Sequence, residues 1–160
     1  MRLENQTSAE LSSTLNMAPE KPKHIHLMGI CGTGMSSLAG ILKDAAYHVT
    51  GSDQNVYPPM SDFLNELSIQ VLEGYASENL HPAPDLVIVG NVITKHNPEA
   101  VELARLNTPY LSLPQALRHF AIGNKKSIVP CGTHGKTTTS ALTAWILEKA
   151  GMDPSFMIGG

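Results

Sequence analysis

The residues best suited to chemistry lie in the glycine-rich stretch GTHGKTTT at 132–139. Its Gly135, Lys136 and Thr137 match the end of the phosphate-binding signature G-x-x-x-x-G-K-[ST]. In that signature glycines let the backbone approach phosphate oxygens, the lysine reaches the β- and γ-phosphates, and the hydroxyl binds magnesium. The first glycine of the signature is replaced by Pro130, and a glycine three residues before Gly135 gives a shorter loop. The stretch therefore predicts a nucleotide-phosphate loop with Lys136 as its principal cation.

The segments around this loop predict the elements that would position it. We expect a strand over 127–130, a helix over 138–150 and another strand over 155–158. The N-terminus of that helix would direct N–H groups and the positive end of its dipole at the phosphates. Such a strand–loop–helix–strand unit is the start of an α/β domain, and it cannot bury its own sheet face. A glycine-rich turn with an exposed lysine is the simpler alternative.

A second glycine-rich loop, Gly29-Ile30-Cys31-Gly32-Thr33-Gly34, also follows an expected strand and precedes an expected helix. A dinucleotide fingerprint would have glycine where Cys31 stands, which weakens the case for NAD. Asp53 follows at the spacing of an acidic residue that hydrogen-bonds a ribose. The loop thus predicts a diphosphate-bearing ligand, with Asp53 either near its ribose or a solvated turn residue.

Other polar residues near these strands have two interpretations each. Asn91 follows an expected strand, at the edge where open α/β sheets bind ligands, and it either contacts a ligand or supports a turn. His24 and His26 point the same way on one strand and, with Cys31, suggest a metal only weakly, because a compact four-ligand set is missing.

The pattern of apolar residues predicts the fold that carries both loops. Short apolar strands alternate with amphipathic helices, and this alternation is typical of a parallel sheet with helices on both faces. We expect an α/β chain: a disordered leader over 1–22, a Rossmann-like doubly wound domain over 23–123, and the start of a P-loop domain over 124–160. The strands are expected at 24–28, 47–50, 70–72, 85–89 and 110–113, with helices after the first glycine loop, from Ser61, from Pro98 and over 114–121.

Composition limits the classes of function. The chain has 160 residues, 42% of them hydrophobic, and a net charge of −3 without a basic stripe, so no nucleic-acid partner is expected. No apolar run is long enough to span a bilayer, and the polar N-terminus does not resemble a secretory signal. Two cysteines inside glycine-rich turns favour a reduced, cytoplasmic protein.

The two loops taken together resemble the Mur ligase family, the amide ligases that build peptidoglycan. The resemblance covers about residues 24–160 and rests on HLMGICGTGMSSLA (26–39), VTGSD (49–53), DLVIVGNVITKHNPE (85–99) and GTHGKTTT. The histidine in the last motif is similar to the branch that acts on UDP-N-acetylmuramate itself. GSDQNVYPPMSDFL (51–64) is most similar to the peptidoglycan-recycling branch, which attaches L-alanyl-γ-D-glutamyl-meso-diaminopimelate; the branch that attaches L-alanine is the alternative.

The resemblance implies a reaction and a role for each loop. The lactyl carboxylate of UDP-N-acetylmuramate attacks the γ-phosphate of ATP, and the amine of the murein tripeptide then displaces phosphate from the acyl phosphate. Thr137 would also contact Mg²⁺. The implied ATP site is Gly132, Thr133, His134, Gly135, Lys136, Thr137 and Thr138, with Lys136 catalytic. The implied UDP-sugar site is Gly32, Thr33, Gly34, Met35, Ser52 and Asp53, and we add Asn91 to it from its place at the sheet edge.

The sequence leaves two other classes of function open. One is a non-catalytic module that senses a UDP-sugar or NAD(H), and the other is a P-loop NTPase that uses hydrolysis as a switch. The 160 residues show no acidic magnesium ligand after a second strand, no general base and no pocket for an amine. We therefore expect this chain to bind its nucleotides without completing the ligation.

Overall fold

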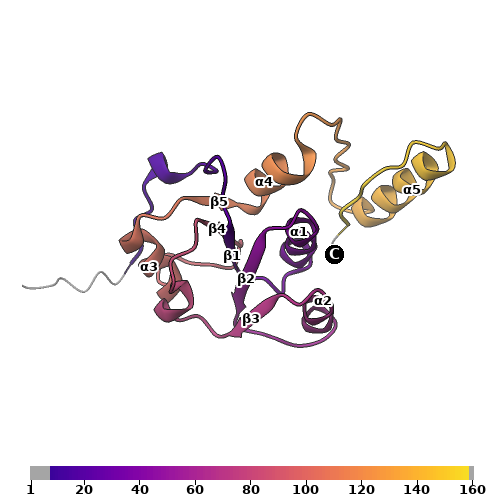
Figure 1. Ribbon diagram of the computed structural model, residues 1–160. Helices are drawn as coiled ribbons and strands as arrows, with labels where there is room; N and C mark the ends of the chain where they lie inside the picture. The colour runs from indigo at the N-terminus through magenta and orange to yellow at the C-terminus, as the bar shows by residue number, and fades with distance from the viewer. Residues whose placement is uncertain (1–7, 159–160) are drawn as a thin grey trace, which may run out of the picture. The chain divides into compact units, whose positions relative to one another are not determined.

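The part of the chain up to Gly123 is built on a five-stranded parallel sheet in the order β3-β2-β1-β4-β5 (Figure 1). The computed structural model describes residues 8–158. The chain adds β2 and β3 on one side of β1 and then crosses to add β4 and β5 on the other, which makes the sheet doubly wound. This confirms the predicted Rossmann-like architecture. The strands are β1 (His24–Met28), β2 (His48–Asp53), β3 (Gln70–Glu73), β4 (Leu86–Val89) and β5 (Tyr110–Ser112).

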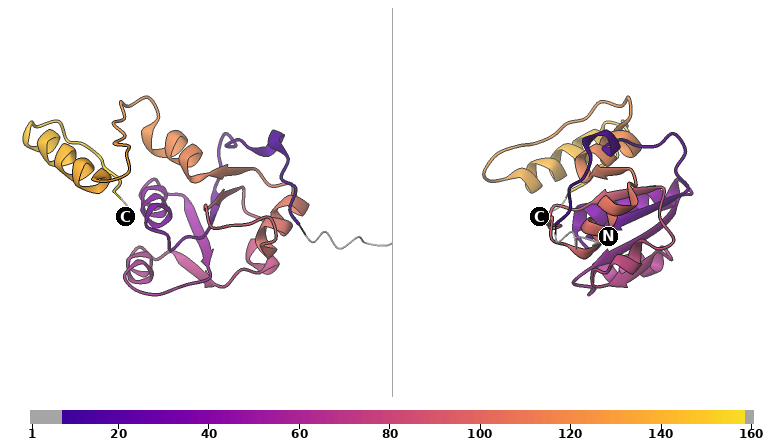
Figure 2. Two further views of the ribbon diagram at one scale, coloured as in Figure 1. Left: turned by 180° about the vertical axis from the view of Figure 1, so that it is seen from behind. Right: turned by 90° about the vertical axis from the view of Figure 1, so that its left-hand side faces the viewer.

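Helices cover both faces of the sheet. Helices α1 (Thr33–Asp44) and α2 (Met60–Glu66) lie on one face, while α3 (Pro98–Leu106) and the short η2 (Ser77–Leu80) lie on the other (Figures 1 and 2). After β5 the chain forms α4 (Leu113–Ala116), which continues as the π-helical turn η3 (Leu117–Ile122). Among residues 8–158 no helix is long and apolar enough to cross a bilayer.

The core follows from the apolar strands. Side chains of a parallel strand alternate between two covered faces, so both sets are apolar. On the α3 face, Met28 and Val87 pack with Leu80, Ala100 and Leu103, all of them buried. The opposite face is filled from α1, whose apolar spacing buries Leu38, Ala39 and Leu42. The core therefore packs β1, the strand before the first glycine loop, from both faces of the sheet.

The segment before β1 has defined contacts over residues 8–22, which differs from the predicted disorder; residues 1–7 lie outside the described residues. Ala9 donates its backbone N–H to the Lys95 carbonyl at 2.6 Å. Asn16 donates to the Tyr110 carbonyl at 3.1 Å, and Gln115 donates to the Asn16 side chain at 2.6 Å. These few specific bonds hold a polar segment that buries little apolar surface.

The chain divides into two compact units between Gly123 and Asn124. In the second unit the described regular element is α5 (Lys136–Lys149). The strands predicted over 127–130 and 155–158 are wrong: neither segment pairs with another in the described structure. A strand needs a neighbour for its backbone N–H and C=O groups, and Ile128, Val129 and Phe156 are exposed rather than packed against one.

Candidate functional site

Loops from neighbouring strands meet at the carboxyl edge of the sheet, where β1 and β4 adjoin. The strand order reverses at this point, and open α/β sheets bind ligands in such crevices. Gly29 follows β1 with φ of +82°, and a Cβ there would lie 3.4 Å from Cγ2 of Val92. A Cβ on Gly90 would lie only 2.7 Å from the Met28 carbonyl oxygen. The two backbones approach so closely that glycine is required at position 90.

The first glycine loop rests on the end of β2. The N–H groups of Gly29 and Ile30 both donate to the Ser52 carbonyl, at 2.8 and 3.1 Å. Ile30 is fully buried, and a Cβ on Gly51 would come within 2.5 Å of its Cδ1. The end of β2 therefore sets the path of the loop.

The loop leads into α1, whose N-terminus is open. Gly32 precedes the helix, and no side chain caps it. The first N–H with an acceptor in the helix pattern is that of Ser36, which donates to the Gly32 carbonyl at 2.8 Å. The N–H groups of Thr33, Gly34 and Met35 have no intrahelical acceptor, as at any helix start. Exposed Gly32 and Thr33 and these N–H groups form the type of site that binds phosphate.

Asp53 joins two loops through its carboxylate. One oxygen, Oδ2, accepts the N–H of Cys31 at 2.9 Å, and the other accepts the N–H of Asn55 at 3.0 Å. The residue is only 9% exposed, so it is not a solvated turn residue. Burial, followed by the charge of Asp53, raises the pKa of the Cys31 thiol to about 11, so Cys31 is a neutral thiol near pH 7. Each Asp53 oxygen keeps a lone pair for a further donor.

The other predicted UDP-sugar residues have different environments. Ser52 is fully buried, and its hydroxyl donates to Oε2 of Glu99 at 2.6 Å, so that hydroxyl lies between the sheet and α3 rather than facing the first glycine loop. The side chain of Met35 is also buried, which leaves its N–H for a ligand. Gly34 is close to Leu113, whose Cδ2 would lie 3.0 Å from an added Cβ. Asn91 is exposed in the turn after β4.

Two residues at this edge were not predicted. Tyr75 follows β3, and its hydroxyl lies 3.8 Å from where a Cβ on Gly29 would be. Burial, followed by the charge of Asp53, raises the pKa of Tyr75. Its position after a strand could have indicated it, because all parallel strands end at the same edge. Glu99 is fully buried. The sequence did not indicate its burial, because an acidic residue in the first turn of a helix is common at the surface.

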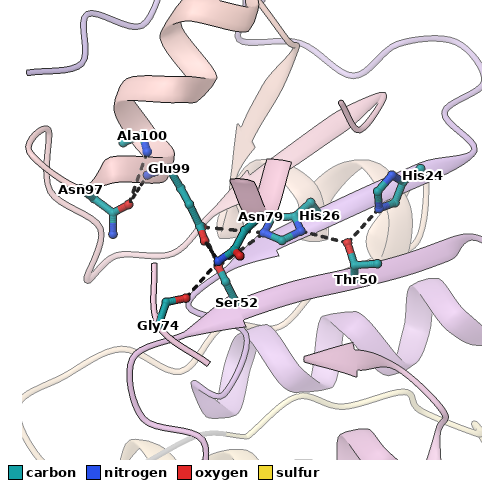
Figure 3. Close-up of polar contacts among 9 residues, drawn as sticks. All are labelled: His24, His26, Thr50, Ser52, Gly74, Asn79, Asn97, Glu99 and Ala100. Atoms are coloured by element: carbon teal, nitrogen blue, oxygen red, sulfur yellow. Dashed lines mark hydrogen bonds and ion pairs between the residues drawn. The ribbon is translucent and has the colours of Figure 1, made fainter. Parts of the chain in front are cut away.

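The two histidines of β1 belong to a buried polar chain on the α3 side of the sheet (Figure 3). The Thr50 hydroxyl lies 2.8 Å from Nε2 of His24 and 2.9 Å from Nδ1 of His26. His26 Nε2 lies 3.4 Å from the Ser52 hydroxyl and 3.8 Å from Glu99. Over residues 8–158 no three His, Cys, Asp or Glu side chains are grouped as a metal site. The histidines are part of a hydrogen-bonded network.

The second glycine loop is open and leads directly into α5. Gly132 and Gly135 have φ of +152° and +76°, values that favour glycine. Gly135 precedes α5, which begins at Lys136, two residues before the predicted start, and no side chain caps it. Nζ of Lys136 donates to the Gly132 carbonyl at 2.9 Å and lies 3.4 Å from the Thr133 carbonyl. The lysine therefore folds back over its own loop.

The remaining residues of this loop are all exposed. They comprise Thr133, His134, Thr137 and Thr138. The hydroxyl of Thr137 lies in the first turn of α5, where a helix start and a lysine favour phosphate. One hydroxyl suits Mg²⁺ only together with phosphate oxygens and water, which is how proteins usually hold this ion beside a nucleotide.

Comparison with known proteins finds relatives that match most of this chain. A family model described as "Mur ligase family, catalytic domain" matches residues 24–125. The chain is 47% identical over 136 residues, or 85% of its length, to the UDP-N-acetylmuramate--L-alanyl-gamma-D-glutamyl-meso-2,6-diaminoheptandioate ligase of Escherichia coli (strain K12), of which it covers 30%. It is 39% identical over 145 residues, or 90% of its length, to the UDP-N-acetylmuramate--L-alanine ligase of Neisseria gonorrhoeae, again covering 30%.

A solved structure agrees with these relatives. The crystal structure of the UDP-N-acetylmuramate:L-alanyl-gamma-D-glutamyl-meso-diaminopimelate ligase from Neisseria meningitides superposes with a TM-score of 0.83 at 42% identity. The match covers 88% of this chain and 44% of that one. The chain thus spans about 30% of the length of the curated relatives it matches.

Proposed function

Because the chain belongs to the Mur ligase family, we propose that it supplies the UDP-sugar site and the ATP-phosphate loop of an ATP-dependent amide ligase. The ligase joins UDP-N-acetylmuramate to L-alanyl-γ-D-glutamyl-meso-diaminopimelate in peptidoglycan recycling, a reaction of the cytoplasm, where ATP is available. The observation that carries this proposal is the pair of open helix starts, at α1 and α5, each preceded by a glycine loop after an apolar segment. Two phosphate-bearing substrates need two such sites.

We assign the UDP-sugar to the unit that ends at Gly123. The diphosphate binds the exposed start of α1, at Gly32, Thr33, Gly34 and the N–H of Met35. Asp53 holds the loop and offers its remaining lone pairs to the ribose. Two further residues complete the site. Asn91 lies on the β4 side of the crevice, and Ser52 contributes through its backbone.

We assign ATP to the loop at 132–138, with the chain from 124 onward as the start of the ATP-binding domain. Lys136 leaves the carbonyls of Gly132 and Thr133 and binds the β- and γ-phosphates instead. The loop N–H groups stabilise the same negative charge. Mg²⁺, held by Thr137 together with the phosphates, would supply further charge neutralisation when bound.

The chemistry explains why both loops are needed. A carboxylate is a poor electrophile, so the lactyl carboxylate first attacks the γ-phosphorus, which forms an acyl phosphate and breaks the bond to ADP. The tripeptide amine then attacks the acyl carbon, and phosphate leaves with its electron pair. Two anions must meet in the first step, so Lys136 and the loop dipoles have to offset their repulsion.

The identities to relatives support the tripeptide as the amine substrate. The chain is more similar to the relative named for L-alanyl-gamma-D-glutamyl-meso-2,6-diaminoheptandioate, at 47%, than to the relative named for L-alanine, at 39%. The choice depends on an assay with both amines.

The test is ligation by a protein of the relatives' length that contains this chain. We expect ADP and an amide product when UDP-N-acetylmuramate, ATP and the tripeptide are combined, and far less product with L-alanine. Lys136→Ala should lower the rate by about 100-fold or more, whereas Lys149→Ala, at the other end of α5, should not. Product formation without ATP, or a Lys136→Ala variant with normal rates, contradicts the proposal.

A further inference from the structure

Glu99 is a buried carboxylate to which the proposed chemistry gives no role. Its side chain is fully buried in the first turn of α3 (Figure 3). The Asn97 side chain accepts the N–H of Glu99 at 2.9 Å and so fixes where the helix begins. Removing a carboxylate from water is costly unless hydrogen bonds or charges replace the water. The partners of Glu99 therefore indicate what its burial achieves.

The first partner is Ser52. Its hydroxyl donates to Oε2 of Glu99 at 2.6 Å, and a hydrogen bond to a charged acceptor is stronger than a neutral one. The carbonyl of the same residue accepts the N–H groups of Gly29 and Ile30, at 2.8 and 3.1 Å. Glu99 thus holds, through Ser52, the backbone that sets the path of the first glycine loop.

The second partner is Asn79, which lies in η2 on the connection from β3 to β4. Its Nδ2 donates to Oε1 of Glu99 at 2.6 Å and to the Gly74 carbonyl at 3.1 Å. Gly74 precedes Tyr75, which lies at the same sheet edge as the glycine loop. Through Ser52 and Asn79, the two oxygens of one carboxylate therefore connect the loop after β1, the end of β2 and the start of the loop after β3.

We propose that Glu99 is a positioning residue for the UDP-sugar site, acting through Ser52 and Asn79 without touching the ligand. The inference rests on the proposed function. It predicts that ligand affinity depends on a buried residue of α3 that does not touch the ligand, because a phosphate site made of backbone N–H groups works only when their directions are fixed.

A matched control lies one turn further along the same helix. Glu102 is also nearly buried, at 6% exposed, and its carboxylate binds Arg105 and His81, with Nη2 and Nε2 at 2.7 and 2.9 Å. Its described hydrogen bonds reach none of the loops at the carboxyl edge. Glu102→Gln therefore replaces a carboxylate of α3 that is about as buried as Glu99, but it leaves the hydrogen bonds of Glu99 to Ser52 and Asn79 in place.

The test measures UDP-N-acetylmuramate binding to the full chain by calorimetry at a temperature where every variant is folded. We expect Glu99→Gln to raise Kd about tenfold and Glu102→Gln to change it less than about twofold. Adding Ser52→Ala to Glu99→Gln should raise Kd little further, because both substitutions remove the same Ser52–Glu99 hydrogen bond. Equal Kd values for Glu99→Gln and Glu102→Gln, or fully additive effects of Ser52→Ala, overturn the inference.

Hydrogen exchange separates this inference from the proposed function. In Glu99→Gln the amides of Gly29 and Ile30 should exchange faster than in the parent chain or in Glu102→Gln. If the parent chain does not bind the UDP-sugar, the proposed function fails, but the exchange data still show whether Glu99 holds the loops. Unchanged exchange in Glu99→Gln overturns the inference that Glu99 holds them. If Glu99→Gln does not fold, Asn79→Ala tests the second partner alone, with faster exchange expected around Gly74.

Discussion

Replacing Asp53 with alanine should remove the bond that holds the first glycine loop at Cys31, while the bonds of Gly29 and Ile30 to Ser52 remain. The carboxylate accepts two backbone N–H groups, those of Cys31 and Asn55, at 2.9 and 3.0 Å. Both bonds are made to a residue that is 9% exposed. The loop would lose its link to the segment after β2, and the Cys31 N–H would lose its partner.

The expected loss follows from these two bonds. A hydrogen bond to a charged group contributes about 1.5–3 kcal/mol to stability. Asn55 is exposed, so water replaces the carboxylate there, whereas Cys31 is half-buried and its N–H is replaced less completely. Asp53→Ala should therefore lower the free energy of unfolding by about 2–4 kcal/mol. Asp53→Asn keeps one acceptor oxygen and should lose about half of that.

Urea unfolding followed by far-UV circular dichroism measures this loss. Tryptophan fluorescence is unsuitable, since the one tryptophan, Trp145, lies in the second compact unit. Asp44→Asn is the control, because Asp44 is exposed at the end of α1 and should change stability by less than about 0.5 kcal/mol. An Asp53→Ala variant as stable as this control would refute the claim that the carboxylate holds the two loops together.

Three further predictions test the site and its supports. At about pH 8 an alkylating reagent should modify exposed Cys131 first and Cys31 more than about a hundredfold more slowly, because the pKa of Cys31 is raised to about 11; equal rates in peptide mapping contradict this. Burial, followed by the charge of nearby histidines, lowers the pKa of His24 below 6.5. The stability that neutral His24 contributes is therefore complete above pH 6.5 and is lost as the pH falls. His24→Gln should flatten this part of the stability–pH curve, and an unchanged slope would contradict the prediction. Gly51→Ala should lower the free energy of unfolding by about 1–3 kcal/mol because its Cβ meets a side chain at 2.5 Å, whereas Gly32→Ala, with 3.5 Å of room, should not; equal melting temperatures would contradict this.

Much of the sheet could be predicted from the sequence. The run at 86–89 is apolar without interruption, as expected for a strand covered on both faces, whereas the strand before the first glycine loop, HIHLM, combines apolar residues with two histidines. The start of α3 was also predictable, because Pro98 favours the first turn of a helix and Asn97 caps it. These features are local, so they can be read from neighbouring residues.

The errors concern interactions that are not local. Segment 127–130 has strand-forming residues but no partner in the described structure, and strand formation depends on pairing. The π-helical turn η3 replaced the end of a predicted regular helix. The resemblance implies Ser52 as a UDP-sugar residue, and strand alternation directs its hydroxyl toward Glu99, an interaction that the sequence did not predict. Finding that partner required the position of α3.

Binding of UDP-N-acetylmuramate to this chain, compared with binding of NADH, tests the central claim most directly. Both ligands carry a diphosphate and a ribose, so a glycine loop alone does not separate them. We predict that calorimetry detects saturable binding of UDP-N-acetylmuramate, weakened by Asp53→Ala and unaffected by Lys136→Ala, and no comparable binding of NADH. Tight binding of NADH, with none of the UDP-sugar, would contradict the assignment.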